Sequence, residues 1–139
     1  MYKVPDLRFW LGHAGDGRDY KTQLESGIQA VVQVALEEPP LHGPRELWYC
    51  RFPLVDGAGN ETRLLFITVK TLTNLLHEGI PTLVCCGGGM SRSPAVAALA
   101  IGQLRSEDPQ ACLKRITEGH PCDVSPGLWN DLIALFPTH

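Results

Sequence analysis

The chain lacks long hydrophobic runs, and this absence limits where it can reside. Its longest apolar stretches, such as residues 94–101, have about eight residues, whereas a membrane-spanning helix needs about 20. The first residues also lack the apolar run of a secretory signal peptide. We therefore expect no membrane association and no export.

Positive charge is also in short supply. The 12 Lys and Arg residues are outnumbered by 15 Asp and Glu residues, which gives a net charge of -3. No basic face for sequence-independent nucleic-acid binding is implied, so we expect no nucleic-acid partner. The 14 glycines and 11 prolines follow no period, which excludes a fibrous repeat. A length of 139 residues suits a single domain, residues 1–139, with a core of its own.

The cysteines do not form a disulfide framework or a structural zinc site. Their number is odd, two of them are adjacent, and no C-x-x-C pair is present. His120 and Cys122 have a spacing that zinc sites use, but a second ligand pair is missing. The sequence therefore predicts no metal and a reducing, cytoplasmic location. The five cysteines are Cys50, Cys85, Cys86, Cys112 and Cys122.

Hydrophobic patterning predicts strands and helices that alternate along the chain. The expected strands span residues 7–11, 28–36, 46–52 and 82–85, and the expected helices span residues 20–26, 62–77, 93–104, 109–118 and a last segment that Ser125 and Pro126 open. This order is typical of an α/β domain with four to five mostly parallel strands and helices on both faces. Ligands bind beyond the carboxyl ends of such strands, where residues 53–60 and 86–92 lie.

The segment from Cys86 to Arg92 has the composition of an oxyanion cradle. Three glycines after Cys86 allow backbone amides to turn inward, and a helix N-terminus follows with its unpaired N–H groups. The planar guanidinium of Arg92 matches two oxygens of a phosphate. The Cys86 thiolate is expected to be stabilised at the mouth of this positive field.

This segment, Cys86-Gly-Gly-Gly-Met-Ser-Arg-Ser93, resembles the signature loop of the cysteine-dependent protein tyrosine phosphatases. Its Ser-Arg-Ser ending is most similar to their compact dual-specificity branch. Further segments resemble that branch over almost the whole chain: the opening strand and turn at residues 9–12, the buried strand at residues 27–35, the general-acid loop at residues 53–56 and the start of the closing helix at residues 125–129.

The resemblance implies a role for each residue of the loop. Cys86 would attack phosphorus and form a phosphocysteine, and Asp56 would protonate the leaving oxygen and then activate water. Ser93 would help the thiolate leave in the second step. No cofactor or metal is required. The predicted phosphate-binding residues are Gly87, Gly88, Gly89, Met90, Ser91 and Arg92.

Several of these residues have a second interpretation. Asp56-Gly57 is a common turn dipeptide, and Asp16 and Asp19, in a glycine-rich polar loop, are the next candidates for the acid. Ser93 suits a helix N-cap with Pro94 behind it. Ser91 is expected to stabilise the loop and Met90 to point outward.

The sequence departs from the family pattern directly before the nucleophile. The family has a histidine there, which helps to hold the loop, whereas this chain has Cys85. Strand alternation predicts that Cys85 faces away from Cys86, as an inert core thiol. Cys50, on a strand expected near that of Cys86, is either a redox partner or a buried thiol.

The sequence therefore predicts a hydrolase: a dual-specificity or tyrosine phosphatase that acts on a phosphorylated protein or a small phosphomonoester. One alternative is a phosphate-binding pseudo-phosphatase of low turnover, because the histidine is absent. Another Cys-x5-Arg enzyme, rhodanese-like or an arsenate reductase, fits less well, because an upstream aspartate loop and a serine after the arginine are phosphatase features. The physiological substrate and the oligomeric state are not encoded in any pattern that we identify.

Overall fold

The computed structural model describes residues 1–137, and its strands form one sheet in the order β1-β2-β5-β3-β4. Neighbouring strands from β2 to β4 run parallel, and only the edge strand β1 is antiparallel to its neighbour. The predicted sheet, mostly parallel and with four to five strands, is confirmed. The strands are β1 (Tyr2–Lys3), β2 (Phe9–Gly12), β3 (Ala30–Gln33), β4 (Trp48–Arg51) and β5 (Thr82–Cys85).

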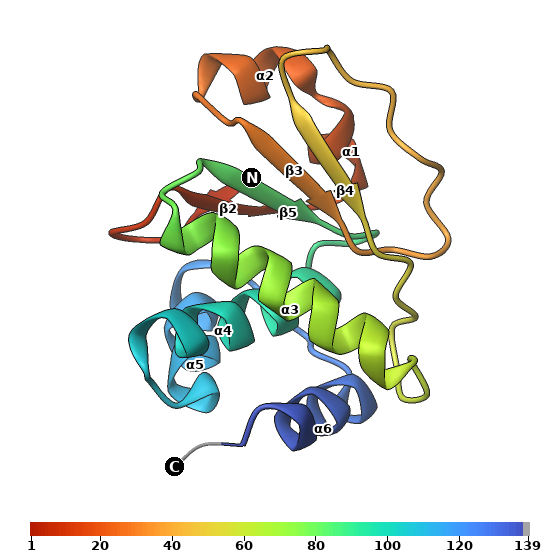
Figure 1. The fold of residues 1–139 in the computed structure, drawn as a ribbon, viewed down its shortest axis with the longest axis vertical. Coiled ribbons are helices and arrows are strands. Elements are labelled where there is room, and N and C mark those ends of the chain that lie inside the picture. Colours follow the sequence, from red (N-terminus) through yellow and green to blue (C-terminus); the bar gives the residue numbers. More distant parts are fainter. Residues whose placement is uncertain (138–139) are drawn as a thin grey trace.

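Helices cover both faces of this sheet, as predicted. The longer helices lie on one side of it, and the two short N-terminal helices lie on the other (Figure 1). The short helices are α1 (Ala14–Arg18) and α2 (Tyr20–Glu25); the longer ones are α3 (Thr62–His77), α4 (Arg92–Arg105), α5 (Pro109–Gly119) and α6 (Pro126–Leu135). Within residues 1–137, no helix combines the length and the hydrophobicity that a membrane span requires.

The two strands β3 and β4 are shorter than the sequence pattern indicates. Gln33 at the end of β3 is in register with Cys85 on one side and with Arg51 on the other, where both neighbouring strands end. Beyond residue 33 no further residue pairs in register, although the amide of Val34 still donates to the carbonyl oxygen of Cys85 at 2.8 Å. Val34 remains buried, whereas Leu36 is exposed. The run of hydrophobic residues continues past the end of β3, because a hydrophobic residue indicates burial and not hydrogen bonding to a neighbouring strand.

Two elements are absent from the sequence-based prediction, namely β1 and α1. A strand of two residues is too short to show an alternating pattern. Helix α1 contains Gly15 and Gly17, which are poor helix formers. It forms because the Nδ1 atom of His13 accepts hydrogen bonds from the amides of Gly15 and Asp16, at 3.0 and 3.3 Å. Such a side-chain cap satisfies amides that the helix leaves free.

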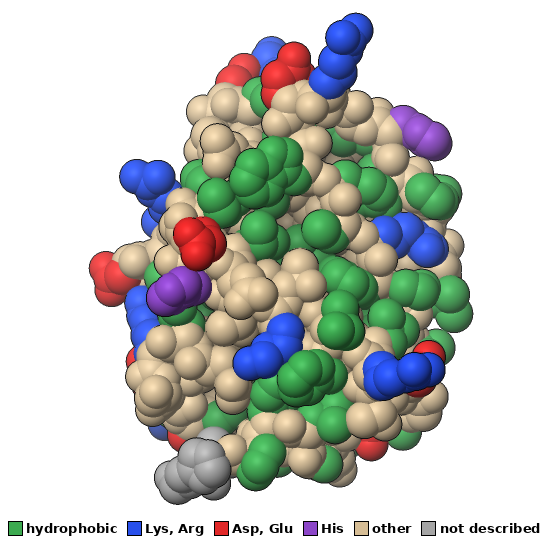
Figure 2. Space-filling model, viewed as in Figure 1, with side chains coloured by type: hydrophobic (Ala, Val, Ile, Leu, Met, Phe, Trp, Pro, Cys, Tyr) green, Lys and Arg blue, Asp and Glu red, His purple; other side chains and the backbone are tan. Residues whose placement is uncertain are grey.

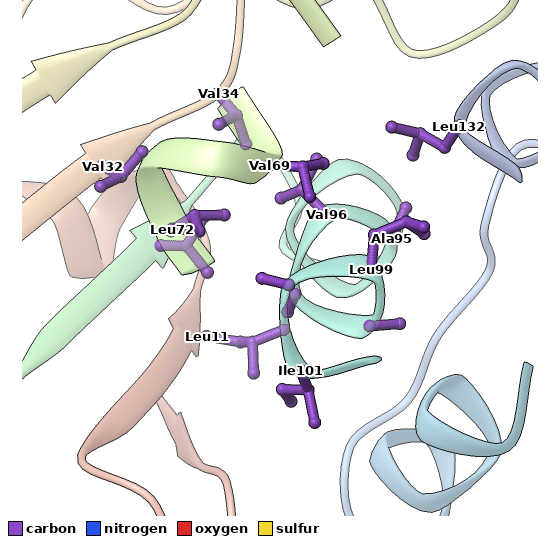
Figure 3. Close-up of a cluster of buried hydrophobic side chains, with 14 of the residues drawn as sticks. Leu11, Val32, Val34, Val69, Leu72, Ala95, Val96, Leu99, Ile101 and Leu132 are labelled. Carbon is purple, nitrogen blue, oxygen red and sulfur yellow. The ribbon is translucent and has the colours of Figure 1, made fainter. Parts of the chain in front are cut away.

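Helix α4 lies at the centre of the core. Its residues from Arg92 to Gly102 are all buried, and α3 packs along it. Figure 3 shows Val69 and Leu72 of α3 beside Val96 and Leu99 of α4, with Leu11 and Val32 of the sheet nearby. The burial of these side chains supplies the main driving force for folding. It also determines where α4 begins, and therefore where the loop before it lies.

We expect the replacement of Leu72 by alanine to destabilise the protein strongly. The Leu72 side chain is fully buried on the face of α3 that packs against the core. A Leu→Ala change at such a site costs about 2–5 kcal/mol of unfolding free energy. Leu24→Ala, at a position that is 48% exposed, serves as the matched control and should change that free energy by less than about 1 kcal/mol. Urea denaturation of both variants tests this expectation, and equal losses would contradict the assigned core.

Candidate active site

The loop between β5 and α4 folds around the sulfur of Cys86. The Cys86 side chain is buried, and its Sγ atom accepts a hydrogen bond from the amide of Gly89 at 3.2 Å. Gly89 has a φ of +76°, and a Cβ there would lie 3.0 Å from backbone atoms of Gly12 and His13. Only glycine combines this conformation with such a close approach. The glycine at position 89 therefore allows the backbone to point its amide at the Cys86 sulfur.

Arg92 is the first residue of α4, and its side chain is buried beside the loop. Its Nη1 atom donates to the carbonyl oxygen of Leu54 at 2.9 Å and to Oε1 of Glu37 at 2.6 Å. Its Nη2 atom donates to Oε2 of Glu37. The Nε atom is buried and has no hydrogen-bond partner among residues 1–137. The guanidinium is thus fixed at one end and has a free donor on its Nε edge.

Glu37 is a component of the site that sequence reasoning missed. Arg92 lowers the pKa of its carboxyl from 4.5 to about 2, chiefly through the hydrogen bonds between the two side chains. Glu37 in turn raises the pKa of Arg92. A usable signal was present, since Glu37 follows a buried strand at the carboxyl edge of the sheet. The prolines after it instead indicated an ordinary loop.

The structure brings Asp56 to the signature loop, as the sequence predicted. Its Oδ1 atom accepts a hydrogen bond from Oγ of Ser91 at 2.5 Å, and the residue is exposed. The same Ser91 hydroxyl accepts a hydrogen bond from the amide of Ser125 at 2.9 Å. Ser91 therefore joins the segment after β4, the loop and the start of α6. The predicted loop-stabilising position of Ser91 agrees with these contacts.

The alternative interpretation of Ser93, as the N-cap of helix α4, is wrong. The helix begins at Arg92, so Ser91 occupies the N-cap position and Ser93 lies within the first turn. The Ser93 hydroxyl is buried and has no hydrogen-bond partner among the described residues. Ser125 does occupy the N-cap position of α6, but its side chain makes no capping bond.

The loop is also held by segments that the sequence did not single out. Nε2 of His120, after α5, lies 2.8 Å from the carbonyl oxygen of Gly89. The amide of Asp123 donates to the carbonyl oxygen of Met90 at 2.8 Å, and the amide of Ala14 donates to that of Gly87 at 3.0 Å. Met90 itself is 45% exposed at the tip of the loop, as expected. These contacts depend on chain reversals that no local pattern encodes.

Cys85 and Cys86 lie on opposite faces of the sheet. Cys85 belongs to a small cluster with Val31, Leu41 and Leu83, whereas Cys86 belongs to the main core. Burial raises the pKa of the Cys85 thiol to about 12, with a smaller contribution from Cys86. Cys85 is therefore a neutral core thiol, as strand alternation predicted.

The predicted proximity of Cys50 to the Cys86 strand is wrong, because β3 lies between β4 and β5. Cys50 is in register with Val32, and Val32 with Val84. Two strand spacings place Cys50 about 10 Å from Val84. A disulfide requires Cα atoms within about 7 Å, so Cys50 cannot bond to Cys86 without backbone movement. All five cysteines are free thiols.

Asp16 and Asp19, the alternative candidates for the acid, are occupied as helix caps. Oδ2 of Asp16 accepts a hydrogen bond from the amide of His13 at 3.0 Å. Asp19 accepts hydrogen bonds from the hydroxyl and the amide of Thr22 at 2.7 and 3.2 Å, and these bonds lower its pKa. Residues 14–18 of the expected glycine-rich loop form α1 instead, and Asp19 links this helix to α2, which lies within the predicted helix at residues 20–26. Among the described residues, neither carboxylate forms a hydrogen bond or an ion pair with the signature loop.

Solved structures with a similar arrangement of strands and helices include several phosphatases. Human DUSP28 is 22% identical, with a TM-score of 0.81 over 92% of this chain and 90% of its own. A mouse putative dual specificity phosphatase, complexed with zinc tungstate, is 24% identical, with a TM-score of 0.81 over 94% of this chain and 83% of its own. This chain has the dual-specificity phosphatase fold.

The similarity extends to the tyrosine phosphatase OH1 of Orf virus, which is 23% identical with a TM-score of 0.73 over 98% of this chain and 86% of that protein. No protein-family model matches the sequence. A search of curated proteins also finds no matching relative. These similarities confirm the fold that the signature loop implied.

We expect the ion pair between Glu37 and Arg92 to stabilise the protein only while Glu37 is ionised. Because the folded-state pKa lies below the unfolded-state value, the unfolded chain binds the proton more readily, and stability is lost as the pH falls. The stability advantage of the parent protein over Glu37→Gln should thus be complete above about pH 5 and decline toward about pH 2. Urea denaturation at several pH values measures it, and an advantage that does not change with pH would contradict the ionic interaction.

Proposed function

We propose that the protein is a cysteine-dependent phosphomonoester hydrolase that acts on phosphorylated proteins through a phosphocysteine intermediate. The observation that carries this proposal is the buried Cys86 sulfur, which lies within a loop whose Gly89 amide points at it. The buried Nε donor of Arg92 has no hydrogen-bond partner within residues 1–137. A phosphate group supplies the acceptor oxygens that such a cradle requires.

In the first step, the Cys86 thiolate attacks phosphorus in line with the ester oxygen. A sulfur–phosphorus bond forms as the phosphorus–oxygen bond to the alcohol breaks, and Asp56 donates its proton to the departing oxygen. The Nε edge of Arg92 and the amides of residues 87–92 stabilise the equatorial oxygens. The position of Asp56 beside Ser91 supports this assignment.

In the second step, Asp56 accepts a proton from a water molecule, which attacks the phosphocysteine. The sulfur–phosphorus bond breaks, inorganic phosphate leaves, and the thiolate is restored. We assign Ser93 to this step, because its buried hydroxyl bonds to none of the residues that the structure describes and is free to donate to the departing sulfur. Ser91 is committed to Asp56 and Ser125 and serves to hold the loop.

A second candidate function is that of a phosphate-binding pseudo-phosphatase. The observation that favours it is the pairing of Arg92 with Glu37, which offsets the positive charge of the cradle before any substrate arrives. One structural neighbour, 17% identical with a TM-score of 0.75, is the human tyrosine phosphatase-like serine/threonine/tyrosine-interacting protein. Continuous release of phosphate from an aryl phosphate distinguishes an enzyme from a binding protein.

The proposed substrates are phosphorylated proteins and small phosphomonoesters. The cytoplasmic location and the absence of nucleic-acid and membrane partners stay predictions from sequence. The fold similarity supports the phosphatase interpretation over rhodanese-like or arsenate reductase chemistry, since the neighbours are named as phosphatases.

We expect Cys86→Ser to abolish hydrolysis of p-nitrophenyl phosphate while it retains binding of tungstate, a phosphate analogue. The amides and Arg92 supply most of the affinity for an oxyanion, whereas only sulfur forms the covalent intermediate. Steady-state kinetics and titration calorimetry measure the two properties. Cys50→Ser is the matched control and should remain active. Turnover by Cys86→Ser at the parent rate would overturn the covalent mechanism.

We expect Asp56→Asn to lower kcat by about 10²–10⁴-fold for phenyl and alkyl phosphates. The loss should shrink as the leaving group becomes more acidic, because such groups depart without a proton. Asparagine retains an oxygen that accepts the Ser91 hydrogen bond, so the loop contact is preserved.

A leaving-group series measured with both proteins tests this role. Asp19→Asn is the control, since asparagine caps α2 as well as aspartate does. If Asp56→Asn matches the parent across the whole series, the proton donor is another residue.

A further inference from the structure

Glu37 lies at the mouth of the signature loop, although no step of the proposed reaction uses it. Its carboxylate accepts hydrogen bonds from both terminal nitrogens of Arg92. A Cβ built on Gly87 would lie 2.8 Å from Oε2 of Glu37, so the carboxylate also rests against the first residue after the nucleophile. Its side chain is nevertheless 53% exposed. A bound substrate can therefore reach it.

The pairing leaves Arg92 with one edge for a ligand. Nη1 uses its hydrogens on Glu37 and on the carbonyl oxygen of Leu54, and Nη2 uses one of its own on Glu37. The remaining donors are the second N–H of Nη2 and the buried Nε, which has no partner among residues 1–137. These two N–H groups lie side by side on a guanidinium and fit two oxygens of a phosphate. A phosphate bound there is a close neighbour of the Glu37 carboxylate.

Two arginines near Glu37, Arg18 and Arg51, bond to other groups. Arg18 pairs with Glu38 at 3.3 Å, and Arg51 donates to the carbonyl oxygens of Leu36 and Glu38. The exposed hydrophobic residues beside Glu37, beside Asp56 and at the loop tip are Leu36, Val55 and Met90. A substrate that approaches the loop therefore meets these hydrophobic side chains. It also meets exposed carboxylates, and that of Glu37 is one of them.

We propose that Glu37 is a specificity-determining residue that selects phosphopeptides with lysine or arginine next to the phosphorylated residue. This inference rests on the proposed function, since it assumes that the cradle binds phosphate. A basic side chain of the peptide pairs with the exposed Glu37 carboxylate while the phosphate takes the free edge of Arg92. An acidic side chain at that position is repelled by the same carboxylate.

The test uses Cys86→Ser protein, which binds without turnover, and two phosphotyrosine peptides that carry either lysine or glutamate on both sides of the phosphotyrosine. Fluorescence anisotropy should show that the lysine peptide binds about tenfold more tightly. Adding Glu37→Gln should bring the two affinities within about twofold, because the glutamate peptide gains affinity. Glu38→Gln removes the same charge one residue away and should keep the preference. Glu37→Ala replaces Glu37→Gln if the latter does not fold.

Equal affinities for the two peptides in the parent, or a preference that survives the loss of Glu37, would overturn the proposal. Weaker binding of both peptides by Glu37→Gln with an unchanged ratio would also overturn it and would leave Glu37 as a positioning residue for Arg92. The proposed enzyme is tested separately, by phosphate release from an aryl phosphate with Cys86 intact. An inactive protein with the Glu37-dependent preference would retain this proposal and exclude the hydrolase.

Discussion

The burial of helix α4 is the constraint on which the rest of the site depends. Its residues from Arg92 to Gly102 are enclosed by the sheet and the surrounding helices, so its position and rotation are determined by packing on all sides. Four alanines, at positions 95, 97, 98 and 100, leave little side-chain volume around it and allow neighbours to approach closely. The N-terminus of α4 is thereby held close to the end of β5. The chain must complete the turn from Cys86 to Ser91 in the space that remains.

That turn is held largely by other segments of the chain, through its backbone and through the Ser91 hydroxyl. Its glycines contribute backbone groups, and the partners come from the turn after β2, from the segment after α5 and from the amide before α6. Because β3, β4 and β5 are parallel, the segments after β3 and β4 reach the same edge and deliver Glu37 and Asp56 to it. The buried guanidinium of Arg92 thus pairs with the carboxylate of Glu37. The carboxylate of Asp56 accepts a hydrogen bond from the neighbouring Ser91.

The face of the molecule that Figure 2 draws carries few cues to this chemistry. Hydrophobic side chains are spread across the face in Figure 2, with Lys, Arg, Asp and Glu side chains scattered between them. On helix α3 the exposed hydrophobic residues are Phe66 and Ile67, and Phe66 stacks on Phe136 with ring centroids 5.5 Å apart. The chemically distinctive groups are instead the buried ones: the Cys86 sulfur, the Arg92 Nε and the Ser93 hydroxyl.

The sequence alone determined the α/β class, the exact bounds of α3 and β5, and the convergence of Cys86, Arg92 and Asp56. These features follow from local periodicity, from glycine-rich turn chemistry and from the rule that parallel strands end at one edge. Only the tertiary structure decided the strand order that separates Cys50 from Cys86, the start of α4 that removes Ser93 from the cap, and the pairing of Glu37 with Arg92. Each of these depends on which segments meet in space, and contacts between residues as distant as 37 and 92 leave no period in a single sequence.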